Sequence, residues 1–187
     1  TGAANTVTFV NGTLNHANML ATINGYAGDV IGTDDIFIGI SSSNLTIDSG
    51  KHFTTLAGTT YQPEGNLTLS GGGDVTINGL LQLNNDVNIS GNIITIPGNI
   101  TGLTSTRKLT ITNADTSTIS GSITTNMGSF TKTGAGALTL SATNTYIGTT
   151  FLNNGILNIT SAANLGYAAN DLTVGGSGGT LQTTGNL

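Results

Sequence analysis

The sequence of 187 residues contains no cysteine. Disulfide frameworks and thiolate metal sites are therefore excluded. Basic residues are nearly as scarce, because the chain has only Lys51, Arg107, Lys108 and Lys132, and its net charge is −5. A nucleic-acid groove needs more positive charge than this, and so does electrostatic attachment to an anionic membrane. No apolar run approaches the roughly 20 residues of a membrane-spanning helix, so we expect neither nucleic-acid binding nor membrane insertion.

Charged and aromatic side chains are also few, at 7% and 5% of the sequence. Thr, Ser and Asn remain to cover the surface, and they suit the exposed positions of strands and turns. The chain has 2 prolines but 28 glycines. Proline would remove donors from a strand ladder, whereas glycine supplies the positive φ that tight corners need. Because the glycines have no three-residue period, collagen is excluded, and the composition favours a structure with many tight turns.

The sequence contains a clear period-two alternation of apolar and polar residues. It is best developed in the triplets Leu138-Thr139-Leu140 and Leu157-Asn158-Ile159. Such an alternation places apolar side chains on one face and polar ones on the other, which predicts short half-buried strands. Glycines and an Asn-Gly pair separate the two runs, as expected for turns. The distance in sequence between the two triplets is roughly 20 residues, which suits one turn of a solenoid.

Similar triplets recur along the chain. They are Leu45-Thr46-Ile47, Leu67-Thr68-Leu69, Val75-Thr76-Ile77, Val87-Asn88-Ile89, Leu109-Thr110-Ile111 and Leu172-Thr173-Val174. The triplets that begin at positions 45, 67, 87 and 109 follow one another at nearly equal intervals. This regularity fits stacked coils of two or three short strands. The interval from Leu109 to Leu138 is clearly longer, which predicts an irregular coil or a bulging loop around residues 113–133.

Two other local structures are compatible with parts of the sequence. Asn-Gly pairs at residues 11–12, 24–25, 78–79 and 154–155 are also hairpin signals, so an antiparallel sandwich is the alternative fold. The segment 14–23 could form one short helix before the second of these pairs.

One segment resembles a known family. Residues from Lys132 to Gly166 are similar to the autotransporter-associated β-strand repeat. The parts that carry the resemblance are Lys132, Gly134-Ala135-Gly136, Leu138-Thr139-Leu140, Asn144-Thr145-Tyr146-Ile147-Gly148-Thr149-Thr150 and Gly155-Ile156-Leu157-Asn158-Ile159. Residues 1–131 look similar in composition to passenger domains of bacterial surface autotransporters, including the rickettsial surface antigens.

The resemblance implies an all-β fold, a right-handed parallel β-helix with short irregular loops, displayed outside a Gram-negative cell. It also implies a C-terminal translocator barrel in the parent chain, through which the passenger is secreted and anchored in the outer membrane. No such barrel and no signal peptide are visible in the sequence, so we expect residues 1–187 to be a fragment of a passenger domain, with 132–166 as its clearest repeat. The absence of cysteine fits a chain that crosses the periplasm unfolded.

Candidate catalytic and metal sites are weak. Asp29, Asp34 and Asp35 form the densest carboxylate group and could supply the acid and base of a glycosidase or lyase, or ligands for Ca²⁺. Adjacent strand residues point to opposite faces, so a solvated turn is the favoured interpretation. His16 and His52 lack the partner spacing of a zinc site or a Ser-His-Asp site.

Two glycine-rich runs, at residues 71–74 and 175–179, resemble calcium-binding repeats but do not recur in tandem. We expect both to form corners, and we expect isolated acids such as Asp74 to cap turns. Thr-x-Thr pairs at 104–106, 110–112 and 116–118 would form an ice-binding face if they stacked. Their spacing is much shorter than one coil, which disfavours that function. The sequence thus predicts no catalytic, cofactor-binding or metal-binding residues, and no cofactor.

The functional prediction is a non-enzymatic surface module. We expect a rigid stalk or adhesion segment that contacts a ligand on host cells or on other bacteria. The alternatives are a β-helical enzyme that degrades polysaccharides, using Asp29, Asp34 and Asp35, and a template on which the rest of the passenger folds.

Overall fold

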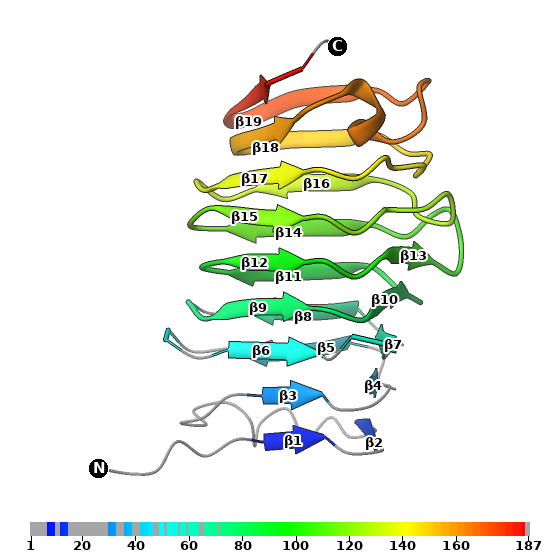
Figure 1. Cartoon of the computed structure of the whole chain (residues 1–187), viewed down its shortest axis with the longest axis vertical. Helices are drawn as coiled ribbons and strands as arrows, with labels where there is room; N and C mark the ends of the chain where they lie inside the picture. The colour runs from blue at the N-terminus through cyan, green and yellow to red at the C-terminus, as the bar shows by residue number, and fades with distance from the viewer. Residues whose placement is uncertain are drawn as a thin grey trace.

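The computed structural model describes residues 7–9, 12–14, 30–32, 36–38, 42–46, 49–50, 52–55, 57–58, 60–63, 66–70 and 72–185. Over these residues the chain winds into a parallel β-solenoid whose coils stack from the N-terminal to the C-terminal end (Figure 1). The predicted all-β, parallel β-helical fold is confirmed. No helix among the described residues is long and apolar enough to span a membrane.

The solenoid has three faces. A coil with a full set of strands contributes one short strand to each face. The first face contains β1 (Val7–Phe9), β3 (Val30–Gly32), β6 (His52–Thr55), β9 (Asp74–Ile77), β12 (Ile94–Ile96), β15 (Ser117–Ile119) and β17 (Ala137–Leu140). The second contains β5 (Ser42–Thr46), β8 (Asn66–Ser70), β11 (Val87–Gly91), β14 (Leu109–Asn113) and β16 (Phe130–Thr133).

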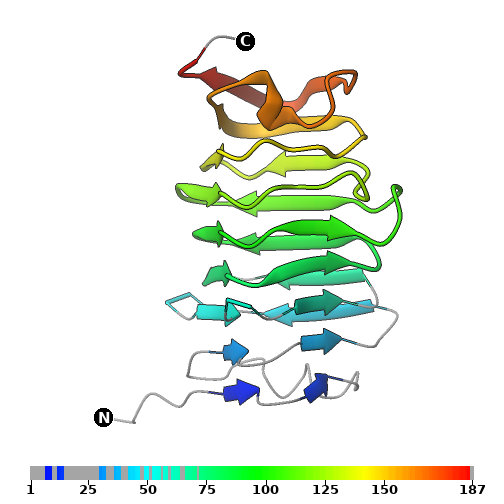
Figure 2. The same cartoon turned by 45° about the vertical axis from the view of Figure 1, so that its right-hand side comes forward.

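The third face ends earliest along the stack. It contains β2 (Gly12–Leu14), β4 (Ile36–Ile38), β7 (Thr60–Pro63), β10 (Leu80–Leu83) and β13 (Ile100–Gly102). These strands lie on the right of Figure 1 and come forward in Figure 2. Because this face loses its strands after β13, the later coils cross it as turns.

Two long strands occupy the C-terminal end of the stack. β18 (Thr150–Ile159) pairs with β16 along its first half and with β17 along its second half. β19 (Leu172–Thr183) follows β18 along both halves, and the 3₁₀ helix η1 (Ala162–Leu165) lies between them in the chain. Since one strand continues from the second face into the first, β18 joins the two faces into one sheet of 14 strands.

All strand pairs among the described residues are parallel, so the antiparallel alternative is wrong. Asn78 and Gly79 connect β9 to β10, which belong to different sheets, and Asn154 and Gly155 lie inside β18. A parallel ladder needs a crossover between paired strands, which here is one full coil. The suggested helix at 14–23 lies outside the described residues except for Leu14.

The predicted irregularity around residues 113–133 is wrong for the two main faces. Leu109 pairs with Phe130 on β16, and Ser117 pairs with Leu138 on β17, so both faces continue into the next coil without interruption. The interval from Leu109 to Leu138 is long because Leu109 lies on β14 of the second face and Leu138 lies on β17 of the first face. The third face is nevertheless irregular in this coil. Residues 120–129 form no strand, and a single β-bridge between Ile123 and Ile100 is their pairing with the preceding coil.

Alternate residues of each strand form inward rows that make the core. On the first face Val75, Ile94, Ser117, Leu138 and Leu157 occupy equivalent positions, and each is at most 1% exposed. Ser117 is the polar member, and its Oγ accepts a hydrogen bond from the backbone N–H of Ile94 at 2.9 Å. Full burial of an apolar side chain contributes about 1.5–3 kcal/mol, so these rows are the main stabilising element.

Candidate functional site

The residues that mark the repeat lie in and around the coil formed by β16 and β17. The first of these residues, Lys132, points into the core. It occupies the inward row of Ile89, Ile111 and Leu152 on the second face. The relative exposure of Lys132 is 0%. An ammonium group in an apolar row needs hydrogen-bond acceptors, because burying it unpaired is strongly unfavourable.

Backbone carbonyl groups supply these acceptors. Lys132 Nζ donates hydrogen bonds to the carbonyl oxygens of Thr133 at 2.6 Å, Gly134 at 2.8 Å and Asn154 at 3.3 Å. Among the described residues no carboxylate forms an ion pair with it. Burial lowers the pKa of Lys132 to about 8 because it disfavours the charged form. The side chain therefore links the corner of its own coil to the corner of the next.

Glycines make room for this link. Gly134 and Gly155 have φ values of 80° and 72°, in the left-handed region that favours glycine. A Cβ atom on Gly155 would lie 2.6 Å from the carbonyl oxygen of Gly136 and 2.9 Å from Lys132 Nζ. The glycines of the repeat are thus required by the close approach of successive corners.

Two buried asparagines form a second link between coils. Asn144 Oδ1 accepts from the N–H of Ile123 at 2.8 Å, and its Nδ2 donates to the carbonyl of Asn164 at 2.6 Å. Asn164 in turn accepts from the N–H of Thr160 at 2.9 Å and donates to the carbonyl of Ala142 at 2.7 Å. Both residues are 3% exposed. The amide of Asn144 therefore connects its own coil to the coil before it and the coil after it.

The tyrosine of the repeat is also internal. Tyr146 is fully buried, and its hydroxyl lies 2.5 Å from the hydroxyl of Thr150. Its ring packs against Phe130 with a centroid distance of 6.2 Å. Burial raises the pKa of Tyr146 to about 12, although the hydrogen bond with Thr150 acts in the opposite direction. Gly148 follows, where a Cβ would lie 2.6 Å from the carbonyl carbon of Gly128.

The repeat residues therefore act on the fold rather than on a substrate. Lys132, Asn144, Tyr146 and Thr150 are each at most 3% exposed, so none of them is presented to a ligand. Any contact with another molecule must use the outward positions, the corners and the turns of the third face.

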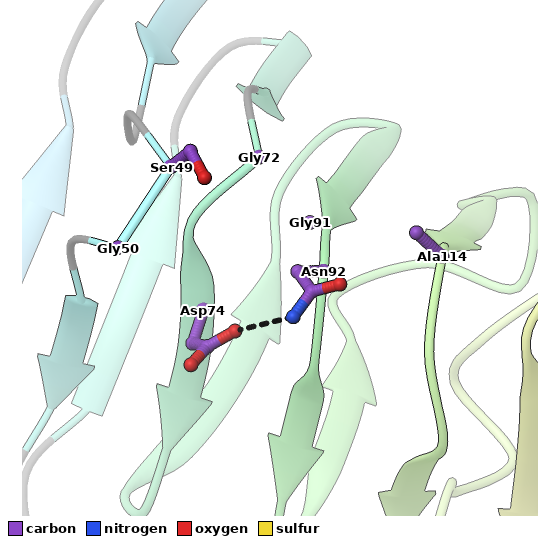
Figure 3. A pocket seen from close by; sticks show the side chains of 7 residues that line it. All are labelled: Ser49, Gly50, Gly72, Asp74, Gly91, Asn92 and Ala114. Carbon is purple, nitrogen blue, oxygen red and sulfur yellow. Dashed lines mark hydrogen bonds between the residues drawn. The ribbon is translucent and has the colours of Figure 1, made fainter.

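One surface hollow runs along the stacked corners that join the second face to the first (Figure 3). Its volume is about 380 Å³, and it is lined by Ser49, Gly50, Gly72, Asp74, Gly91, Asn92 and Ala114. The lining residues come from successive corners, where small residues leave the backbone uncovered. Among the described residues that line it, Asp74 is the charged one.

The polar groups of this hollow bind one another. Asp74 Oδ1 accepts from the N–H of Ile93 at 3.1 Å and from Asn92 Nδ2 at 3.4 Å, so its carboxylate caps the corner of the next coil. His52 lies beside it, with Nδ1 3.6 Å from Asp74 Oδ2. The side chains of this pair are 51% and 30% exposed, and exposed pairs contribute little to stability. The hydrogen bonds of Asp74 stabilise a corner, and no third group of a catalytic triad joins this pair among the described residues.

The other residues proposed from the sequence fall largely outside the described structure. Asp29, Asp34, Asp35 and His16 lie outside the described residues. Within the part of the chain that is described, no group of three or more His, Cys, Asp or Glu side chains could hold a metal ion. The second glycine-rich run lies inside β19, where Gly176 and Gly178 have φ values of 66° and 96° and form the predicted corner.

The structure reveals a threonine row that the Thr-x-Thr pairs did not predict. One outward threonine per coil lies on the first face, and they are Thr54, Thr76, Thr95, Thr118 and Thr139. The signal was present in the sequence, because Thr76 and Thr139 are the central residues of apolar-Thr-apolar triplets. The pairs at 104–106 and 116–118 do not share a face, because Thr104, Thr106 and Thr116 lie outside the strands. Thr118 lies on β15.

Comparison with known proteins agrees with this architecture. Residues 130–159 match the family model of the passenger-associated-transport-repeat. Over 124 residues the chain is 38% identical to the "Adhesin BmaC autotransporter" of Brucella suis biovar 1 (strain 1330). That match covers 64% of this chain and 3% of the relative, so the chain spans a small part of the relative's length. No solved structure matches the chain. The predicted resemblance to an autotransporter passenger repeat is confirmed.

Proposed function

Because the chain contains an autotransporter passenger repeat, we propose that it is a rigid segment of a passenger domain at the surface of a Gram-negative cell. The observation that carries the proposal is the continuous parallel ladder from β1 to β19. Each coil contacts only its neighbours, so stacking produces a rod whose length grows with the number of coils. The parent chain holds this rod in the outer membrane through the C-terminal translocator that autotransporters have.

The segment also contacts a surface ligand in this proposal. The similar protein from Brucella suis is named an adhesin, and the polar repeat residues are internal here, which leaves the outward rows and turns free for contact. The ligand lies on a host cell or on a neighbouring bacterium. No catalytic step is part of the proposal.

Deletion of residues 1–187 from the parent chain tests the contact function. Surface display of the shortened parent must first be confirmed with an antibody against another part of the chain. Loss of cell binding with normal display supports contact by this segment. Unchanged binding contradicts contact and leaves the role of a spacer.

A second candidate function is favoured by the buried network of the repeat coil. Lys132 and Asn144 tie together coils that would otherwise be held by ladders and apolar contacts alone. In this hypothesis residues 132–166 fold into a stable template on which the other coils stack. Deleting 132–166 should then leave the remaining coils sensitive to protease, whereas deleting the coil 87–108 should leave the template protected. Equal protection in both variants would contradict the template function.

The polysaccharide-degrading alternative has its own test. Alanine at Asp29, Asp34 and Asp35 together should leave glycan turnover unchanged, because we expect no turnover in the unmodified chain. Measurable hydrolysis or elimination that the triple variant loses would replace the proposal with an enzymatic function.

A further inference from the structure

A second hollow lies where the last coils cross the third face as turns, away from the corners of Figure 3. It has a volume of about 430 Å³ and lies between the turn that precedes β18 and the segment after it, shown in orange in Figure 1. The lining residues are Thr143, Asn144, Thr145, Ala162, Ala163, Leu165, Gly166, Tyr167, Ala168 and Asn170. Its volume is in the range of about 300–1,000 Å³ that is usual for small-molecule sites.

The hollow has an exposed aromatic residue at its edge. Tyr167 is 62% exposed, in contrast to Tyr61 and Tyr146, which are fully buried. An exposed tyrosine offers a flat apolar ring and a hydroxyl group, with little side-chain entropy to lose on binding. Because the core does not cover this ring, it is available for contact with a ligand.

The loop that presents Tyr167 is held in place by the coil beneath it. The N–H of Tyr167 donates to the carbonyl of Tyr146 at 2.9 Å, and the N–H of Asn170 donates to the carbonyl of Tyr167 at 2.8 Å. Asn170 Nδ2 also donates to the carbonyl of Tyr146 at 2.7 Å. Gly166 turns the chain into this loop with a φ of 86°. The aromatic ring is therefore presented on a fixed backbone, which lowers the entropic cost of binding.

Polar side chains with unused hydrogen-bonding capacity line the same hollow as the ring. Thr143 and Thr145 are exposed, although the backbone between them is fixed by hydrogen bonds from Asn144 N–H to Ala163 and from Thr145 N–H to Ile123. The Oδ1 atom of Asn170 has no hydrogen-bond partner among the described residues, because the hydrogen bonds of its side chain are made by Nδ2. The hollow thus offers two hydroxyl groups and one amide oxygen.

None of the described residues that line the hollow is charged. The nearest charged side chain in sequence is Asp171, which is exposed and follows Asn170. A negative charge there disfavours an anionic ligand, and the absence of a lining carboxylate or ammonium group removes the means of binding a strongly charged one. The chemistry that remains is that of a neutral ligand with one apolar face and several hydroxyl groups.

We propose that this hollow binds one ring of a neutral sugar. The C–H face of the pyranose ring packs on Tyr167, and the sugar hydroxyls hydrogen-bond to the threonines and to Asn170 Oδ1. This inference rests on the proposed contact function and names its ligand class as a cell-surface glycan. A single sugar ring has few atoms, so we expect a dissociation constant on the order of millimolar. A rod with several copies of the hollow, or a glycan with several such rings, would bind more tightly.

Nuclear magnetic resonance titration of the ¹⁵N-labelled chain tests the proposal. The probes are the methyl glycosides of glucose, galactose, mannose and N-acetylglucosamine, with sialic acid as the anionic comparison. We expect saturable shifts of the amides of residues 143–145 and 166–170 with at least one neutral glycoside. Tyr167→Ala should weaken that binding by about tenfold or more, because it removes the stacking surface.

Leu103→Ala is the matched control. Leu103 is 51% exposed and lies on another turn, so its truncation should leave sugar binding unchanged. The proposal is overturned if no neutral glycoside gives saturable shifts, if Tyr167→Ala binds as well as the unmodified chain, or if sialic acid binds at this hollow as tightly as the neutral sugars.

The cell-binding deletion separates this inference from the proposed function. If deletion of residues 1–187 abolishes cell binding but no sugar binds, the sugar site fails while the contact function stands. If a neutral sugar binds but the deletion leaves cell binding intact, the sugar site stands while the contact function fails.

Discussion

At the scale of single residues, a buried cation distinguishes the repeat coil from the other coils that the structure describes. Lys132 replaces an aliphatic residue in the row of Ile111 and Leu152, and its ammonium group is bound by carbonyls of two coils. A buried cation stabilises a structure only when acceptors surround it, and its removal leaves those acceptors without donors.

Lys132→Met should lower the free energy of unfolding by about 2 kcal/mol, because buried carbonyl groups lose their donor. Lys108→Met makes the same chemical change at an exposed position and should alter stability by less than about 0.5 kcal/mol. Urea denaturation of both variants measures the difference. Equal stability of the two would mean that the lysine link contributes nothing.

The stability of the chain should also depend on pH through Lys132. Its pKa is lowered from 10.5 to about 8 in the folded state, so between about pH 8 and pH 10.5 the unfolded chain binds more protons. Stability therefore rises with pH in this window. Burial raises the pKa of Tyr61 and Tyr146, so the tyrosines reduce stability above about pH 10.

The difference between the unmodified chain and Lys132→Met isolates the lysine contribution to this profile, because both proteins contain the tyrosines. Denaturation at a series of pH values should show a rise above pH 8 in the unmodified chain that the variant lacks. The same profile in both proteins would contradict the assignment.

At the scale of elements, the corners decide how closely successive strands can stack. Gly155 lies in the middle of β18, where the strand passes from the second face to the first. It combines a positive φ with backbone contacts that leave no space for a side chain. An outward position in an ordinary strand tolerates most side chains, whereas the corner at Gly155 has no space for even a Cβ atom.

Gly155→Ala should therefore destabilise the chain more than Gly58→Ala. Both glycines have positive φ, at 72° and 82°, but no atom lies within 4 Å of a Cβ built on Gly58. The conformational strain alone costs about 1–2 kcal/mol at either position. At Gly155 the clash with corner carbonyls adds to it, so thermal unfolding should separate the two variants. A Gly155→Ala variant as stable as Gly58→Ala would show that the corner can move apart.

At the scale of the whole molecule, stability is a sum over neighbouring coils. The central coils have paired strands on both sides, whereas within the described residues β19 pairs with β18 alone. Most side chains of β19 are exposed, including Val174 at 53%. In a solenoid such a coil is stabilised by one interface with a neighbouring coil, whereas an inner coil is stabilised by two.

Hydrogen exchange on the chain of 187 residues should follow this order. Amides of β19 should exchange faster than those of β11 and β14, because opening the outer coil breaks one interface and opening an inner coil breaks two. Mass spectrometry of peptides from each strand measures the rates. Uniform exchange of all coils would indicate that the described solenoid unfolds as a single unit.

The sequence by itself determined the short strands and the spacing of the coils. The parallel arrangement was implied by the resemblance to the repeat family, because the Asn-Gly pairs left an antiparallel sandwich as an alternative. Alternation in triplets such as Leu138-Thr139-Leu140 specifies which side chains face inward, and a regular interval of about 20 residues between such triplets is compatible with stacking one coil above another. The strand at 117–119 was missed because Ser117 interrupts the apolar pattern, although its hydroxyl is satisfied inside the core.

Only the tertiary structure decided which residues become neighbours between coils. Lys132 meets Asn154 and Asn144 meets Asn164 although each pair is a full coil apart in the sequence, and Tyr167 shares a hollow with Thr143 and Thr145. Local alternation reports the face of a side chain but not the residue above it. That residue depends on the length of every intervening turn and on the φ values at the corners, which set the register of the next coil.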